Sequence, residues 1–283
     1  MELLGEDHLA IHSSGPAPFG HDAHPLYRAS RLAALPRHTK DETARGLTEA
    51  LEQASIAPWV RAERQRLLDT ARTFMHAGEL TIQMRTNGVV SAGRLAALRE
   101  GLERLPALYR ALWRASGFPI DVVGQRHTAL PDLIERERKA GVPGVFEPRM
   151  ERVYLLPGGL MRTDAYAVAT VLEEVGHGLD VVLGRVLGLE GHAEGSLPGG
   201  AVYRSAQADF GALYQRYKAT VALPPYYRSS RREFFAYGIF SYYLGDDTLK
   251  KKVVGLYRFM EALEREVTVH VAGTTLATST DHG

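Results

Sequence analysis

The stretch "VLEEVGHGLD", Val171–Asp180, decides the expected fold of this chain. Apolar residues recur around it with the 3.6-residue period of an α-helix, which predicts a single helix with one apolar face. These residues are Val168, Val171, Leu172, Val175, Leu179, Val182 and Val186. Thr163 or Asp164 has the kind of side chain that caps the N-terminus of such a helix.

The opposite face of this helix carries Glu173, His177 and Asp180. Residues four apart lie one above the other on a helix, so Glu173 and His177 can reach one metal ion, while Asp180 is placed to support a ligand. A glycine inside a helix costs about 1 kcal/mol relative to alanine, so Gly176 and Gly184 on this face indicate that another part of the chain approaches closely. The alternative is a carboxylate-rich face that simply meets solvent.

A second informative stretch is "PPYYRSSRREFFAYGIFSYYLGDD", Pro224–Asp247. Glu233 has two interpretations within it. Ser230 and Glu233 fit the S-x-x-E capping box, in which the glutamate bonds back to the start of its own helix. The second interpretation, a metal ligand, follows from the family resemblance given next. Tyr226, considered alone, fits an aromatic residue of a turn.

Together, the E-E-x-x-H helix and the downstream "EFFA" resemble the anthrax lethal factor-like peptidases and the related Mlc titration factor A peptidases, which are zincins of the gluzincin type. "GVPGVFEPRMERVYLL" and "LYRFMEALE" extend the resemblance over about residues 95–268. It implies that Glu233 is the third metal ligand and that Tyr226, seven residues earlier, stabilises the transition state. Glu174 stands at the position of the general base. Glu173 departs from the family, which has histidine there.

The glutamate at position 173 changes the expected chemistry. With Glu173, His177 and Glu233 as ligands, two carboxylates cancel the charge of a divalent ion, so we expect weak binding of Zn²⁺, with Mn²⁺ possible, and slow hydrolysis. Three outcomes stay open: an active, divergent peptidase cutting peptide bonds with Glu174 as base; an inactive pseudopeptidase that binds a peptide or protein; or a site in which Glu173 turns away and His192 replaces it.

The expected fold class is α+β, a zincin-like domain with a small mixed sheet and metal-site helices, preceded by a helical region. The expected organisation is an irregular arm over 1–40, a helical region over 41–90, the zincin-like domain over 91–268 and a C-terminal tail over 269–283. The peptide substrate is expected to add as a strand at the edge of the sheet.

Within this organisation, the pattern predicts particular elements. One helix is expected after Pro58 and another from the cap Ser91 to about Ser116. "FPIDVVG", "GVFEP" and "RVYLLP" predict strands, "PDLIERERKAG" predicts a short helix, and the two "LPGG" stretches predict loops.

Composition limits the classes of partner. The chain has 283 residues with 34 basic and 33 acidic side chains, so no field of one sign steers it to nucleic acid or to an anionic membrane. It has no cysteine, so any metal ligands must be His, Asp or Glu. The sequence has neither a cleavable signal peptide nor a long apolar run, which favours a cytoplasmic protein or one exported without such a signal.

Overall fold

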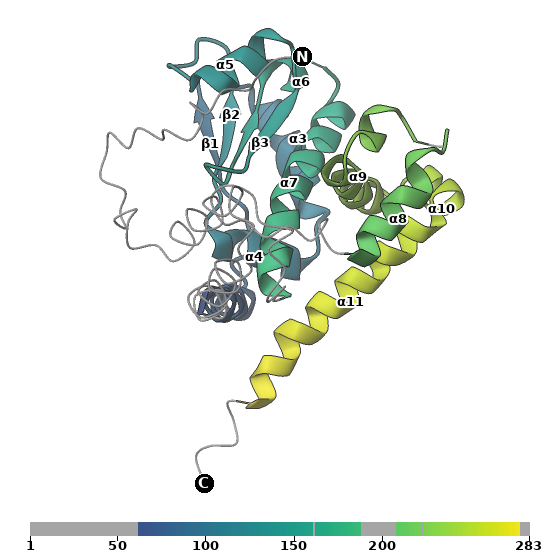
Figure 1. The fold of residues 1–283 in the computed structure, drawn as a ribbon. Coiled ribbons are helices and arrows are strands. Elements are labelled where there is room, and N and C mark those ends of the chain that lie inside the picture. Colours follow the sequence, from purple (N-terminus) through teal and green to yellow (C-terminus); the bar gives the residue numbers. More distant parts are fainter. Residues whose placement is uncertain (1–61, 161, 188–207, 222, 278–283) are drawn as a thin grey trace, which may run out of the picture. The chain divides into compact units, whose positions relative to one another are not determined.

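The computed structural model describes residues 62–160, 162–187, 208–221 and 223–277 (Figure 1). The chain divides into two compact units, Met1–Trp59 and Val60–Gly283, and all described residues belong to the second. The arm predicted over 1–40 and the alternative ligand His192 lie outside the described residues. Among the helices that are described, none combines the length and apolar character that a membrane span requires.

The second unit contains a four-stranded mixed sheet with the strand order β1-β2-β4-β3. Its strands are β1 (Met84–Asn87), β2 (Ile120–Val123), β3 (Gly144–Glu147) and β4 (Arg152–Leu155). β1, β2 and β4 are parallel, whereas β3 forms a hairpin with β4 and is an edge strand. Together with the surrounding helices, this sheet makes the described unit an α+β structure, as the sequence predicts.

Alternation along the strands gives the sheet two buried faces. Ile120 and Val122 of β2 lie in the main hydrophobic core, whereas Val123 belongs to a smaller cluster with Tyr154 of β4. The smaller cluster also contains Ile134 of α5 (Asp132–Lys139), so α5 covers that face. Successive strand residues point to opposite faces, so β2, whose three apolar residues fall on both faces, needs helices on both sides.

The helices collect mainly around α7 (Asp164–Val186), which contacts α3, α4, α9, α11 and strands β3 and β4. The other described elements are α3 (Ala92–Glu103), α4 (Ala107–Ser116), α6 (Pro157–Leu160), α8 (Ala208–Lys218), the 3-10 turn η6 (Tyr226–Arg228), α9 (Arg231–Leu244), α10 (Asp247–Lys252) and α11 (Val254–Ala277). The cap prediction for α7 is confirmed: the Thr163 hydroxyl accepts a hydrogen bond from the backbone N–H of Tyr166 at 3.2 Å.

Several elements differ from the sequence prediction. The single helix expected from Ser91 to Ser116 is two helices, because Pro106, with φ −53° and ψ 150°, ends the first and starts α4. β1 was not predicted, since its residues are partly or fully exposed and it lies at the sheet edge. The first "LPGG" contributes to the short helix α6 instead of a loop. α11 continues to Ala277, into the stretch expected as a tail.

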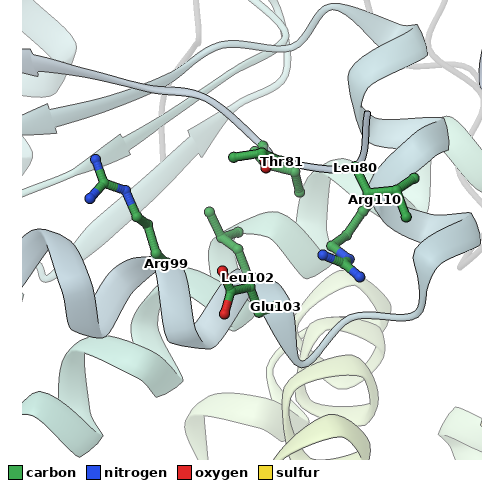
Figure 2. Close-up of a pocket in the computed structure, with 7 residues that line it drawn as sticks. Leu80, Thr81, Arg99, Leu102, Glu103 and Arg110 are labelled. Carbon is green, nitrogen blue, oxygen red and sulfur yellow. The ribbon is translucent and has the colours of Figure 1, made fainter. Parts of the chain in front are cut away.

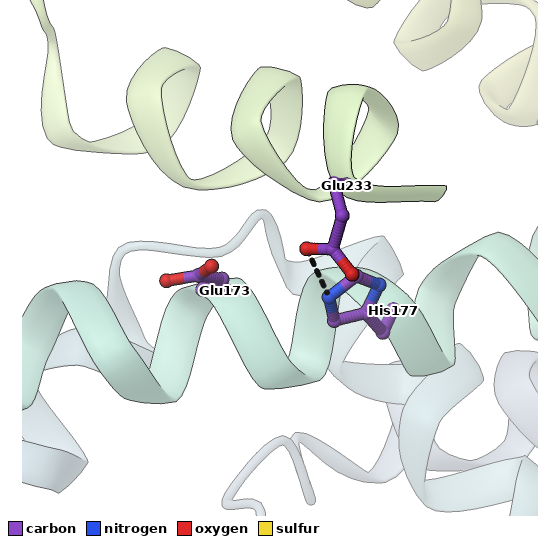
Figure 3. A group of neighbouring side chains, drawn as sticks. All are labelled: Glu173, His177 and Glu233. Carbon is purple, nitrogen blue, oxygen red and sulfur yellow. Dashed lines mark ion pairs between the residues drawn. The ribbon is translucent and has the colours of Figure 1, made fainter. Parts of the chain in front are cut away.

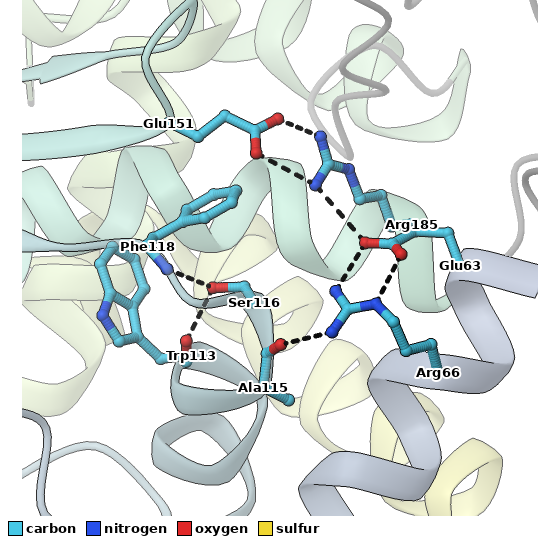
Figure 4. Close-up of polar contacts among 8 residues, drawn as sticks. All are labelled: Glu63, Arg66, Trp113, Ala115, Ser116, Phe118, Glu151 and Arg185. Atoms are coloured by element: carbon cyan, nitrogen blue, oxygen red, sulfur yellow. Dashed lines mark hydrogen bonds and ion pairs between the residues drawn. The ribbon is translucent and has the colours of Figure 1, made fainter. Parts of the chain in front are cut away.

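Residues 62–77 form a helix that is joined to the end of α7 by ion pairs (Figure 4). Arg185 of α7 binds Glu151, in the turn between β3 and β4, and lies 3.9 Å from the Glu63 carboxylate. Glu63 also binds Arg66 at 2.7 Å, and Arg66 donates to the carbonyl of Ala115 at 3.1 Å. These contacts join three segments that are distant in sequence around the C-terminal end of α7.

Candidate metal centre

Glu173, His177 and Glu233 each offer one potential ligand atom, and these atoms lie within 4.8 Å of one another (Figure 3). The Nε2 atom of His177 is 3.3 Å from Oε2 of Glu233. His177 is buried, and the two carboxylates are partly buried. The structure therefore brings together, in one place, the three residues that the sequence nominated as metal ligands.

Two helices that pack closely create this arrangement. Glu173 and His177 are one turn apart on α7, and Glu233 is the third residue of α9. A Cβ atom at Gly176 would stand 3.2 Å from Cβ of Ile239 and 3.3 Å from Cα of Ala236. The absence of a side chain at Gly176 thus lets α9 approach α7, which confirms the close neighbour expected from a glycine on this face.

The capping box predicted at the start of α9 forms only in part. The Ser230 hydroxyl accepts a hydrogen bond from the backbone N–H of Glu233 at 3.1 Å, so Ser230 is the N-cap. The Glu233 carboxylate, however, points to His177 in Figure 3 and does not return to the helix start. The backbone of Glu233 is capped while its side chain faces α7, so the cap does not compete with a ligand role.

Glu174 lies apart from the three-residue cluster and faces the edge of the sheet. It is 7% exposed and contacts β3, where a Cβ atom at Gly144 would be 2.6 Å from its Cγ. The backbone N–H of Phe146, also in β3, interacts with its carboxylate. The predicted general base is therefore a buried carboxylate held between α7 and the edge strand, one residue from a ligand candidate.

Two adjacent tyrosines of η6 reach the two carboxylates of the cluster. Tyr226, which is 56% exposed, interacts through its hydroxyl with Glu233. The hydroxyl of Tyr227 lies 3.4 Å from Oε2 of Glu173 and donates to it. Tyr226 was predicted from the sequence, but Tyr227 was not. The only local signal for Tyr227 is its place beside Tyr226, because its contact with Glu173 spans 54 residues.

Burial and mutual repulsion dominate the electrostatics of the cluster. Burial, and then the Glu233 carboxylate, raise the pKa of Glu173 to about 7, against a lowering by the Tyr227 hydrogen bond. Burial and both neighbouring carboxylates raise the pKa of Glu174 well above its usual value. Burial acts to raise the pKa of Glu233 as well, but contacts with His177 and Tyr226 outweigh it and lower that pKa. A bound cation would relieve this repulsion.

The donor set fits a divalent cation. Two carboxylates and one imidazole suit Zn²⁺ or Mn²⁺. Oε2 of Glu233 is buried and lies 3.3 Å from Nε2 of His177, so these two candidate ligand atoms face each other. Nδ1 of His177 has no hydrogen-bond partner in the described part of the chain. Asp180 is 1% exposed and follows His177 by three residues on α7, and its supporting role for a ligand stays a prediction.

A hollow elsewhere in the unit involves α3, α4 and the segment before β1 (Figure 2). It is lined by Leu80, Thr81, Ile82, Arg99, Leu102, Glu103 and Arg110. The guanidinium groups of Arg99 and Arg110 do not converge on one point in Figure 2. None of the lining residues belongs to the metal-ligand cluster, so the two features are distinct.

No protein-family model and no curated protein sequence matches this chain.

Proposed function

We propose that this protein is a divergent, zincin-like, metal-dependent peptidase. The observation that carries the proposal is the meeting of Glu173, His177 and Glu233 within 4.8 Å of one another, with Glu174, the residue after Glu173, buried at the sheet edge. Such a combination provides a cation site and an adjacent base, which are the two elements of metal-assisted hydrolysis.

In this proposal, Glu173, His177 and Glu233 hold the cation, Zn²⁺ or Mn²⁺. When bound, such a cation supplies Lewis-acid polarisation of the substrate carbonyl and of water. Glu174 accepts a proton from the attacking water, a role that its carboxylate has beside the residues that hold the cation. Tyr226 is partly exposed beside Glu233 and donates a hydrogen bond to the developing oxyanion.

The proposed substrate is a peptide or protein segment in extended conformation. Among the described residues β3 is an edge strand, so one side of its backbone is paired with no other strand there. A peptide that adds along this edge would gain backbone hydrogen bonds and would pass Gly144, the residue of β3 that contacts Glu174. The edge strand therefore supports a peptide bond, in preference to a small molecule, as the group that is cleaved.

A second candidate function is a pseudopeptidase that binds a peptide without cutting it. The contact between His177 and Glu233 favours it, because Nε2 of His177 lies 3.3 Å from Oε2 of Glu233. A bound cation would have to replace this contact, which lowers the gain from binding it. The two functions differ in whether a metal-loaded protein hydrolyses peptides.

One experiment tests the proposal. The full chain, purified without a histidine tag, is loaded with Zn²⁺ or Mn²⁺, analysed for metal content and incubated with a library of unstructured peptides. We expect bound metal and cleavage that a chelator abolishes. The isosteric substitution Glu174→Gln should keep the metal and remove cleavage. Metal without any cleavage would favour the pseudopeptidase, and absence of metal at excess concentration would reject the metal site.

A further inference from the structure

Tyr227 has a ring that its neighbours fix in place. The ring centroid lies 5.2 Å from that of Tyr226, 4.9 Å from that of Tyr237 and 5.4 Å from that of Phe240. Rings at such separations make favourable tilted or edge contacts. The position of the Tyr227 hydroxyl is therefore set by an aromatic cluster on η6 and α9, and not by Glu173 itself.

This fixed hydroxyl is directed at one oxygen of Glu173, 3.4 Å away. A carboxylate presents two oxygens that can exchange places by rotation, whereas an imidazole is a rigid ring with one ligand atom on each side. A donor that engages one carboxylate oxygen limits this rotation and leaves the other oxygen for a cation. Groups that hold ligands in this way affect metal binding strongly.

We propose that Tyr227 is a positioning residue that orients Glu173 as a metal ligand and so offsets the use of glutamate at this position. The inference rests on the proposed function, because it assumes that Glu173 binds the cation. The two adjacent tyrosines then have different roles. Tyr227 orients Glu173, while Tyr226, beside Glu233, contacts the substrate.

The test compares two hydroxyl deletions. Tyr227→Phe removes the donor to Glu173 and keeps the ring in its aromatic cluster. Tyr243→Phe is the matched control, because its hydroxyl also donates to a carboxylate, that of Glu264 at 3.3 Å, and neither residue is in the metal-ligand cluster. Each full-length variant, purified without a histidine tag and freed of metal by a chelator, is titrated with Zn²⁺ and with Mn²⁺ in a calorimeter.

We expect Tyr227→Phe to weaken metal binding by about 10-fold, at the lower end of the loss that follows removal of a group supporting a ligand. Tyr243→Phe should bind metal as the wild type does. Equal affinities for Tyr227→Phe and the wild type would overturn the inference. The proposed function would survive that result, because the wild type would still bind metal. A wild type that binds no metal would instead contradict both the proposed function and the role of Tyr227.

A second comparison separates positioning from a merely structural role. In the background of Glu173→His there is no carboxylate to hold, so adding Tyr227→Phe should change affinity by less than about 2-fold. The same 10-fold loss in both backgrounds would contradict the inference, since the tyrosine would then act through the general fold. Thermal unfolding in the presence of chelator provides the folding control. Loss of the metal-free fold by Tyr227→Phe would also contradict a positioning role.

Discussion

The side chain of Glu174 occupies the space that a side chain at Gly144 would need. A Cβ atom at Gly144 would lie 2.6 Å from Cγ and 2.9 Å from Oε1 of Glu174, distances shorter than van der Waals contact. The edge strand β3 can approach the carboxylate this closely only because residue 144 is glycine. The position of the proposed base is thus fixed from two sides, by α7 and by the backbone of β3.

The substitution Gly144→Ala tests this relationship. The added methyl group must displace Glu174 or β3, and a shift of about 1 Å in a catalytic group can reduce hydrolysis by about 100-fold. We expect a loss of peptide cleavage on that order, with metal affinity nearly unchanged, because the three atoms nearest to the added Cβ all belong to Glu174. Gly93→Ala is the control, since outside its own helical turn no atom of the described residues lies within 4 Å of the added Cβ. Unchanged cleavage in Gly144→Ala would show that the placement of Glu174 is not critical.

Gly178 allows a different close contact, between α7 and the ring of Trp113. A Cβ atom there would stand 2.5 Å and 2.6 Å from two ring carbons, and Trp113 is 1% exposed. We expect Gly178→Ala to destabilise the protein by about 1–3 kcal/mol, the usual effect of overpacking a core. Chemical denaturation of Gly178→Ala and of Gly93→Ala measures the difference. A Gly178→Ala variant as stable as the wild type would mean that α4 moves without cost.

The sequence predicted those features of the site that depend on local periodicity. The cap Thr163 and the shared face of Glu173 and His177 follow from helix geometry alone, and the glycine at position 176 predicted a close neighbour without identifying it. The placement of Glu233 next to His177 came from a resemblance in spacing, since no local rule relates residues 56 apart. Helix packing supplies that contact.

Other features could not be predicted from a single sequence. The contact between Tyr227 and Glu173 and the approach of Gly144 to Glu174 are set by packing between segments that are far apart in the chain. β1 is short, lacks a buried residue and has no apolar alternation, so only its pairing with β2 identifies it as a strand. The break at Pro106 was readable, because proline interrupts the helix interior, but the apolar pattern on both sides of it suggested continuity.

The raised pKa of Glu173 predicts how the stability of the metal-free protein depends on pH. Its pKa is about 7 in the folded chain against 4.5 for an unperturbed glutamate, so folding favours the protonated form. This stabilisation is complete below pH 4.5 and is lost as the pH rises through 7. The pKa of Glu174 is also raised, so Glu174 likewise makes the folded chain less stable as the pH rises. The pKa of Glu233 is lowered, so Glu233 affects stability only when the pH falls below its ordinary value of 4.5.

We therefore expect the chelated protein to resist urea better at about pH 5.5 than at about pH 8. Denaturation at the two pH values measures the difference. Glu173→Gln, which cannot ionise, should reduce the difference in stability between the two pH values. The difference should be smaller still in the double variant Glu173→Gln and Glu174→Gln. Greater stability of the wild type at the higher pH would contradict the claim that burial and mutual repulsion raise the pKa values of these carboxylates.

The last prediction concerns Glu173→His, which replaces an acidic ligand candidate by a neutral one. The cluster would then present one carboxylate instead of two, so a bound divalent cation would keep a net positive charge and would act as a stronger Lewis acid. The softer donor set should also favour Zn²⁺ over Mn²⁺. We expect Zn²⁺ affinity to rise by about 10-fold or more, which corresponds to about 1.4 kcal/mol, and peptide cleavage to rise with it.

The control for this gain is Glu174→Gln in the Glu173→His background. It should retain the tighter metal binding and lose the added cleavage, because only the proposed base is changed. Cleavage by the wild type that Glu174→Gln removes would identify an active, slow peptidase. Cleavage that begins only after Glu173→His would identify a site that lost its activity with that one ligand. Tight Zn²⁺ binding by Glu173→His without cleavage would mean that replacing this one ligand does not restore catalysis. The protein would then be better described as a pseudopeptidase that binds a peptide at the edge strand.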